Sequence, residues 1–238
     1  MSDGLLEYIP QDPDTPYPLG RSVVWHDPRN RAFAALPEVE QLTRLSRFYF
    51  TLDVYDQIGP SCTANAGVGV CRTGPNLARF RTHREYAPYD TEWERHELYI
   101  RAQGEDPWPG PPPPYDGSST DAPYKVLRNE GAIAGWETIF GVEELRVYVL
   151  TKGPASVGTK WGYDDFYPEQ HDGYIIGEGS SAGGHAYRVV GFSHTRYAFR
   201  IVNTWGRDWG ESGRAWMRYD VMGERLDDDG ESFAPVMT

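Results

Sequence analysis

The 238-residue sequence predicts an α+β fold, with helices in its first half and an antiparallel β-sheet in its second half. Two observations support this prediction. Segments made of small residues, or with apolar residues at helical spacing, lie between residues 62 and 131, and alternating or continuous apolar segments separated by turns follow residue 184. A hydrophobic fraction of 39% and an aromatic fraction of 14% are typical of a chain with a packed core. A cleft can form between two such layers.

The chain begins with a segment that lacks sustained periodicity. Residues 1–45 are rich in Pro, Asp and Arg, with a short apolar run at 32–36, and we interpret them as an extended N-terminal arm. The sequence RFYFTLDV at 47–54 then predicts a strand, and DQIGPS at 56–61 is dense in turn formers. A tight loop is therefore expected to lead into Cys62.

Helices are expected over residues 46–125, the predicted helical subdomain. The small residues of CTANAGVGVC at 62–71 favour a closely packed, buried helix, although Gly67 and Gly69 lower its propensity. TEWERHELYIRAQ at 91–103 predicts a second helix with Trp93, His96 and Tyr99 or Ile100 near one face. A short helix is expected at 124–131, whereas VEELRVYVLT at 142–151 fits a helix or a strand.

A Pro-rich run at 107–119 ends the second helix, and its four consecutive prolines at 111–114 favour a polyproline II conformation. A rigid surface connection is the simpler interpretation, and a docking peptide for a partner is the alternative. Beyond it, HAYRVVGF at 185–192, YAFRIVN at 197–203 and RAWMR at 214–218 predict strands of an antiparallel sheet. They define a mainly β subdomain over residues 126–238, which forms one unit with the helical subdomain.

Charge and cysteine count exclude several functions. The net charge of −12 would repel a phosphate backbone, so nucleic-acid binding is not expected. No long apolar run or export leader is visible, which favours a cytoplasmic location without membrane contact. Two cysteines cannot form a disulfide framework or a four-cysteine zinc site. The acidic run at 227–229 lacks the spacing of a calcium loop and is interpreted as a solvated turn, so no metal or cofactor is expected.

Cys62 is the candidate nucleophile. It follows a Gly-Pro-Ser turn at the start of the predicted helix, where the positive end of the helix and a nearby imidazolium would both lower a thiol pKa. Cys71 would be buried inside the same helix, and a disulfide between the two would be strained. A buried, unreactive thiol is the alternative interpretation of Cys62 when it is considered alone.

A histidine and an asparagine further along the chain could complete a catalytic group. His185 follows two glycines at the head of a predicted strand, from which its ring could project into a cleft. Asn203 ends the next strand, and its amide oxygen could fix the imidazole tautomer while Trp205 excludes water. The alternatives are a hydrogen-bonded core histidine and a Gly-rich corner packed on tryptophans.

Three ordered blocks resemble the signature blocks of papain-family cysteine peptidases. They are the segment from Gln57 to Cys62 with the helix behind it, GGHAYRVVGF around His185, and NTWGRDWGESG from Asn203. The block GPSCTANA and the arm sequence GRSVVWHDPRNRAF are similar to the bacterial and phage branch of that family. The resemblance implies a papain-like fold, with a helical left subdomain, an antiparallel β-sheet right subdomain and the active site in the cleft between them.

Residue by residue, the resemblance implies Cys62 as nucleophile, His185 as general base and acid, Asn203 as the orienting residue and Gln57 as an oxyanion donor. Gly184 and Trp205 match supporting positions. The glutamine precedes the cysteine by five residues where the family usually has six, and Thr204 and Pro60 replace the usual Ser and Gly. The implied oxyanion hole therefore depends on a locally shortened turn.

The implied function is a cysteine endopeptidase that forms a thioester with its substrate and needs no cofactor. A weakly active or inactive papain-fold component, for example of a virion, is one alternative, and an amidase or acyl transferase with the same triad is another. Expected partners are a peptide or protein substrate and a virion or host protein, with a location in the cytoplasm of a bacterial host cell or in a virion. About 45 residues precede the first predicted strand, so we expect no large proregion to be removed.

Overall fold

The computed structural model describes residues 14–22, 46–51, 53–80, 89–106 and 116–238. Its α-helices are α1 (Cys62–Cys71), α2 (Asn76–Phe80), α3 (Glu92–Gln103), α4 (Ala122–Asn129), α5 (Gly141–Thr151) and α6 (Tyr219–Asp227). The 3-10 helices η2 (Tyr163–Phe166) and η3 (Pro168–His171) follow β3. The strands are β1 (Arg47–Phe48), β2 (Gly135–Ile139), β3 (Ala155–Gly162), β4 (Tyr174–Ile175), β5 (Ser181–Ser193), β6 (Ala198–Val202), β7 (Arg214–Arg218) and β8 (Glu231–Val236).

The strands form a single sheet in the order β2-β8-β3-β5-β6-β7-β4, with β1 paired to β5. Neighbouring strands are antiparallel except β4 and β7, which are parallel. The long strand β5 lies in the middle and pairs with β1, β3 and β6. The α+β class is therefore confirmed, with a mixed but mostly antiparallel sheet.

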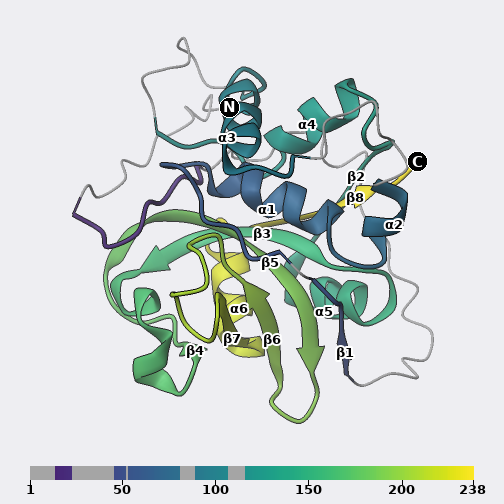
Figure 1. Ribbon diagram of the computed structural model, residues 1–238. Helices are drawn as coiled ribbons and strands as arrows, with labels where there is room; N and C mark the ends of the chain where they lie inside the picture. The colour runs from purple at the N-terminus through teal and green to yellow at the C-terminus, as the bar shows by residue number, and fades with distance from the viewer. Residues whose placement is uncertain (1–13, 23–45, 52, 81–88, 107–115) are drawn as a thin grey trace, which may run out of the picture.

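Helix α1 lies between the sheet and the helices α3 and α4, as Figure 1 shows. One hydrophobic cluster fills the space around the sheet, α5 and α6, and a second is built from α1, α3, α4 and the segment that follows α4. Between them, Cys62, Ala66 and Ala186 form a small cluster of their own. The start of α1 thus meets the middle of β5 at the boundary between two cores.

A buried arginine explains how closely α1 approaches β5. The fully buried Arg188 of β5 donates to the carbonyl oxygens of Gly69 (3.2 Å) and Asp53 (2.7 Å). A Cβ atom on Gly69 would lie 2.4 Å from Arg188 Cδ, which is too close for any side chain. Gly69 lowers the intrinsic stability of helix α1, but its lack of a side chain allows α1 to pack closely on the sheet.

Most predicted elements are confirmed. The helix at 62–71 and the strand at 214–218 have the predicted ends, and the ambiguous segment at 142–151 is helix α5. The helix predicted at 91–103 is α3, capped by Thr91 and Glu94 in a capping box. The strands predicted at 185–192 and 197–203 are β5 and β6, although β5 begins four residues before His185 rather than at it.

Two predictions were wrong in part. The strand predicted at 47–54 is restricted to Arg47–Phe48. The backbone N–H of Tyr49 still donates to Val190 O of β5, but Phe50 O accepts from the backbone N–H of Gly74 instead of from the sheet. The short helix α4 ends at Asn129 rather than 131.

In α3 the rings of Trp93, His96 and Tyr99 lie on one face, as predicted, with neighbouring centroids 5.7 and 5.8 Å apart. Arg95 is among the buried residues of this helix.

Other predictions are not tested. The apolar run at 32–36 and the prolines at 111–114 lie outside the described residues. The division into residues 1–45, 46–125 and 126–238 stays a prediction. Within the described ranges, no helix is both long and apolar enough to cross a membrane.

Candidate active site

Cys62 is the first residue of α1 and is completely buried. The first backbone N–H groups of a helix have no acceptor within it, so they give this end a partial positive charge. Cys71, at the other end of α1, is also buried, and both cysteines are free thiols. The structure therefore places Cys62 next to β5 and Cys71 in the helical core. The burial of Cys71 was predicted.

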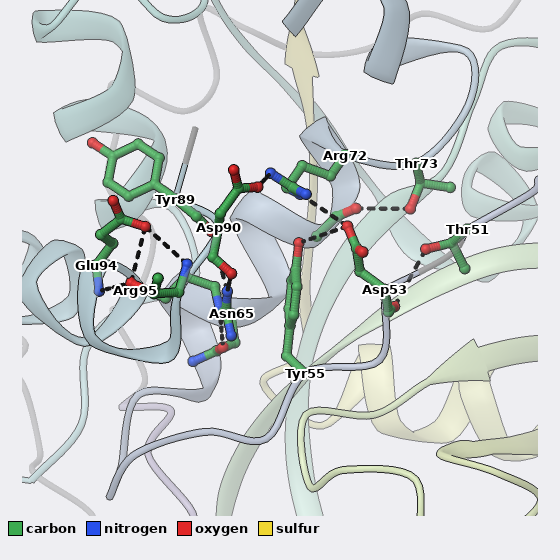
Figure 2. Close-up of polar contacts among 12 residues, drawn as sticks. Thr51, Asp53, Tyr55, Asn65, Arg72, Thr73, Tyr89, Asp90, Glu94 and Arg95 are labelled. Atoms are coloured by element: carbon green, nitrogen blue, oxygen red, sulfur yellow. Dashed lines mark hydrogen bonds and ion pairs between the residues drawn. The ribbon is translucent and has the colours of Figure 1, made fainter. Parts of the chain in front are cut away.

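A chain of polar contacts fixes the start of α1 (Figure 2). Arg95 of α3 donates from Nε to Asn65 Oδ1 (2.8 Å), and Asn65 Nδ2 donates to the carbonyl oxygen (2.9 Å) and hydroxyl (3.0 Å) of Ser61. Arg95 also stacks on the ring of Tyr55, with its Cζ 3.8 Å from the ring centroid. These contacts hold Ser61, the residue immediately before Cys62. The side chain of Ser61 itself makes no capping hydrogen bond to the backbone of the helix.

His185 and Asn203 are joined by a short hydrogen bond. Asn203 Oδ1 accepts from the backbone N–H of Thr204 (2.8 Å), which identifies this atom as the amide oxygen. His185 Nε2, 2.6 Å away, must therefore donate its proton to it. The other ring nitrogen, Nδ1, is buried and makes no hydrogen bond within the described part of the chain. In the neutral ring Nδ1 thus carries a lone pair that can accept a proton.

Aromatic side chains enclose this pair. The ring of Trp205 stacks on the imidazole, with centroids 4.1 Å apart and planes inclined by 24°, and the edge of Trp161 meets it at 4.9 Å. Trp205 is 3% exposed and Trp161 is 0% exposed. The His185–Asn203 bond is consequently shielded from water, which strengthens it.

Gln57 lies beside Thr204, the residue that follows Asn203. Its Oε1 accepts from the hydroxyl of Thr204 (2.5 Å), while its Nε2 donates to the carbonyl oxygens of Gly59 (2.6 Å) and Pro18 (3.1 Å). The threonine at 204 therefore supplies the same hydroxyl contact that a serine could. The role of Gln57 in an oxyanion hole stays a prediction, because its amide is occupied by two main-chain carbonyls.

One of these carbonyls belongs to a segment that covers the site. Residues 17–22, here called the strap and drawn in purple in Figure 1, pass over the start of α1. Gly184 O accepts from the backbone N–H groups of Gly20 (3.1 Å) and Arg21 (2.9 Å). A Cβ on Gly20 would lie 1.8 Å from Pro60 O, so the strap touches the loop that leads to Cys62.

The strap also caps the aromatic enclosure. Tyr17 stacks on Trp205 with centroids 4.9 Å apart, and the indole N–H of Trp205 donates to Pro18 O (2.9 Å). The glycine before His185 explains how the strap fits, because a Cβ on Gly184 would lie 2.1 Å from Arg21 O. Gly184 thus acts by permitting this close approach.

Burial keeps both reactive groups neutral in this arrangement. It raises the pKa of the Cys62 thiol to about 12, against the opposite effect of hydrogen bonds with the backbone of Ala186 and Thr63. It lowers the pKa of His185 to about 3, although the bond to Asn203 favours the charged ring. The strapped site is therefore a dry thiol and imidazole rather than an ion pair.

Comparison with known proteins assigns the fold a family. The family model described as papain family cysteine protease matches residues 61–226, more than half of the chain. The chain belongs to the papain family. This segment contains Cys62, His185 and Asn203, so the predicted family membership is confirmed.

Papain-family structures have the same fold. The chain is similar to xylellain, a cysteine protease from Xylella fastidiosa, with a TM-score of 0.67, 18% identity and coverage of 98% of this chain and 100% of that one. It is also similar to digestive procathepsin L 3 of Tenebrio molitor, with a TM-score of 0.59, 16% identity and coverage of 86% and 73%. At these identities the likeness confirms the papain-like fold.

Among curated proteins, the chain is similar to the cathepsin B-like cysteine proteinases 5 and 4 of Caenorhabditis elegans. The matches are 36% and 31% identical over 75 residues, which is 30% of this chain. They span only 21% and 22% of the length of those relatives.

Two features of the site were missed by the sequence analysis. Asn65 stands in the quoted SCTAN block, but the sequence did not reveal its bonds to Ser61 and Arg95. The strap was expected only as part of an extended arm, because its contacts with Gly184 and Ser118 join residues far apart in the chain. The acidic run at 227–229 follows α6, where Asp228 and Asp229 pair with Lys160.

Proposed function

We propose that the chain is a cysteine endopeptidase that hydrolyses peptide bonds through Cys62, His185 and Asn203. The observation that carries the proposal is the 2.6 Å bond from His185 Nε2 to Asn203, which leaves Nδ1 as a proton acceptor in the strand that Cys62 contacts. A buried ring nitrogen without a polar partner is costly unless a function retains it. A neighbouring thiol that must lose a proton supplies such a function.

In the proposed reaction, His185 Nδ1 takes the proton of Cys62 and the sulfur forms a bond to the substrate carbonyl carbon. The oxyanion receives hydrogen bonds from the Cys62 backbone N–H and from Gln57 Nε2. When the tetrahedral intermediate collapses, the carbon–nitrogen bond breaks and the amine takes its proton from His185. Water, deprotonated by neutral His185, then attacks the thioester and returns the thiol. Asn203 holds the ring in the required tautomer throughout.

This reaction needs a form of the protein in which the strap has moved away. The strap lies against Gly184 and Pro60, on both sides of the site, and Gln57 Nε2 donates to its Pro18 carbonyl. A substrate carbonyl would have to replace the carbonyl of Pro18 at Gln57. Entry of water and substrate would also reverse the desolvation that keeps the thiol and imidazole neutral.

Thiol reactivity tests the proposal. A Gly20→Ala substitution should displace the strap, because its Cβ would overlap the main chain of Pro60, whereas Gly135→Ala points into open space and is a matched control. We expect iodoacetamide to alkylate Cys62 of the Gly20→Ala chain rapidly near neutral pH, and His185→Ala in the same chain to abolish this. Mass spectrometry assigns the label to Cys62 or Cys71.

Slow alkylation of Cys62 in every variant would instead favour an inactive papain-fold packing or binding module, which the neutral, covered site also fits. An activated thiol that cleaves no peptide bond would favour an amidase or acyl transferase using the same triad.

The remaining expectations are proposals of the same kind. We propose a peptide or protein substrate, and the net charge of −12 supports the absence of nucleic-acid binding. Membership of the bacterial and phage branch, a cytoplasmic or virion location and a virion or host protein partner rest on the sequence blocks alone. Detection of cleaved host or virion proteins after expression would support them.

A further inference from the structure

Strands β6 and β7 lie side by side near the β4 edge of the sheet (Figure 1). Two residues of β7, Ala215 and Met217, belong to the hydrophobic cluster that also contains residues of α6. Because successive side chains of a strand point to opposite faces, Arg214, Trp216 and Arg218 lie on the outward face. The outward face of β7 therefore presents two arginines and a tryptophan.

Two guanidinium groups lie over the indole of Trp216. The Cζ atoms of Arg196, from the β5–β6 turn, and of Arg200, the cross-strand partner of Trp216 in β6, each lie 4.8 Å from the ring centroid. The half-exposed ring of Phe48 meets the same indole edge-on at 5.9 Å. A guanidinium keeps its N–H donors in its own plane, where they can bind a carboxylate at two points. We call Arg196, Arg200, Arg214, Trp216 and Arg218 the arginine face.

The arginine face is cationic in a chain that is otherwise acidic. Residues 194–218 contain five arginines, two carboxylates and no lysine, which gives a net charge of +3. Because the whole chain has a net charge of −12, the other residues together carry −15. Burial lowers the pKa of Arg214, and the nearby charges of Arg200 and Arg207 lower it further, against the opposing effect of Glu211. These cations repel one another and would be stabilised by a further anion.

Two arginines of this face already bind carboxylates. Arg200 Nη2 donates to Glu211 Oε2 (2.6 Å), and Arg218 Nε donates to Asp220 Oδ1 (3.2 Å). Both acceptors belong to the same chain and are exposed. Arg200 Nη1 is buried and has no hydrogen-bond partner within the described residues. Donor capacity therefore remains even where a carboxylate is bound.

Two other arginines of the face pair with no carboxylate in the part of the chain that the structure describes. Arg196 Nη1 donates to the hydroxyl of Tyr174 (3.1 Å), and Arg214 Nη1 donates to the carbonyl oxygen of Ser212 (2.9 Å). These neutral acceptors do not balance the positive charge of a guanidinium. Arg196 is exposed and Arg214 is half-buried, so an anion from outside the chain can reach this face.

We propose that the arginine face is a docking surface for a carboxylate-rich segment of another protein. Arginine and aromatic residues are enriched at protein interfaces and lysine is depleted, as on this face. A nucleic acid carries a charge on every phosphate and would extend over the acidic remainder of the chain, whereas a short acidic segment needs only the face itself. The inference goes beyond the proposed peptidase function and holds equally for a chain without the Cys62 thiol.

The test measures binding of two fluorescein-labelled peptides to the full chain carrying Cys62→Ala, which prevents cleavage. One peptide alternates Glu and Ser, and the other has Gln in place of every Glu. Each exposed ion pair typically strengthens binding up to about fivefold, so two new pairs should let the Glu peptide bind about tenfold more tightly. Fluorescence anisotropy gives both dissociation constants, and their difference should shrink as the salt concentration rises.

Arg196→Gln and Arg214→Gln together should remove most of this difference. Arg196→Gln alone, at an exposed position, should weaken binding of the Glu peptide about two- to fivefold without affecting folding. Arg128→Gln is the matched control, because the exposed Arg128 lies over Trp136 of β2 (5.2 Å), at the opposite edge of the sheet. We expect it to leave both dissociation constants unchanged. Circular dichroism and thermal unfolding show whether each variant is folded.

Equal binding of the two peptides would overturn the inference. So would an equal loss of binding in the Arg128→Gln and Arg196→Gln variants, which would show that the arginine face is not the binding surface. A single-stranded DNA of equal charge that binds more tightly than the Glu peptide would assign the face to nucleic acid. Self-association in sedimentation, lost in the double variant, would assign it to a second copy of the chain. Either result would overturn the inference as well.

Discussion

The indole of Trp205 lies flat on the imidazole of His185, with ring centroids 4.1 Å apart, and donates its N–H to Pro18 of the strap. A single side chain thus shields the His185–Asn203 bond and contacts the segment that covers the site. This arrangement links access to the site with the protonation of His185, because desolvation is what lowers the pKa of its ring.

Removing this shield should raise the pKa of His185. In a Trp205→Leu variant we expect water to reach the ring, so the pKa measured by NMR titration should move from about 3 towards the ordinary value of 6.5. Trp216→Leu is the control, because Trp216 packs on Phe48 away from the site. A His185 pKa unchanged by Trp205→Leu would mean that other groups keep the ring dry.

The low pKa of His185 also predicts an effect of pH on stability. A group whose pKa falls on folding contributes stability above its unfolded pKa and loses it as the pH falls towards the folded value. As the pH falls from 6.5 to about 3, the burial of neutral His185 should therefore lower the free energy of unfolding by up to about 1.4 kcal/mol per pH unit.

The measurement for His185 compares urea unfolding of the native chain and a His185→Gln variant from pH 7 to 4. The native chain should lose stability more steeply on acidification than the variant. Burial raises the pKa of Asp106 to about 7, so the stability that this carboxyl group contributes is lost as the pH rises, opposite to the effect of His185. Because both chains contain Asp106, its effect cancels in the comparison. Parallel curves would show that His185 is not desolvated in the folded protein.

Two glycines of α1 should respond oppositely to the same substitution. A Cβ on Gly69 would collide with Arg188, so Gly69→Ala should destabilise the protein by about 1–3 kcal/mol, the usual cost of overpacking. A Cβ on Gly67 would meet Pro123 at 3.5 Å, an ordinary contact, and Gly67→Ala should gain up to about 1 kcal/mol from helix propensity. Thermal unfolding measures both, and similar shifts would argue against the close approach of α1 to β5.

Asn65 should position the nucleophile without reacting. Asn65→Ala removes the contacts to Ser61 and leaves the Nε of the buried Arg95 without its acceptor, which typically costs about 1–3 kcal/mol. In the Gly20→Ala chain we expect Asn65→Ala to lower the unfolding free energy and to reduce kcat with little change in KM, whereas Asn129→Ala, at an exposed position, should change neither. An unchanged kcat would restrict Asn65 to a structural role.

The sequence predicted the candidate site better than it predicted the path of the chain around it. Cys62, His185 and Asn203 stand in blocks whose local pattern is distinctive, and helix α1 has the predicted ends because small residues and turn formers mark it. Strand β3 was missed because Gly158 and Gly162 weaken its strand pattern, although Gly158 is needed to hold Arg21. The burial of Arg95 in α3 was not predicted, because its partners, Asn65 and Tyr55, are distant in sequence.

Cys62 is the proposed nucleophile for cleavage of peptide bonds. The most direct test of this role is proteolysis of an unfolded protein such as reduced casein by the Gly20→Ala chain, compared with the same chain carrying Cys62→Ala or Cys71→Ala. We expect the Gly20→Ala chain to cleave casein, the Cys62→Ala substitution to abolish this cleavage and the Cys71→Ala substitution to leave it intact. Cleavage that persists without Cys62, or no cleavage by a folded Gly20→Ala chain, would contradict this role.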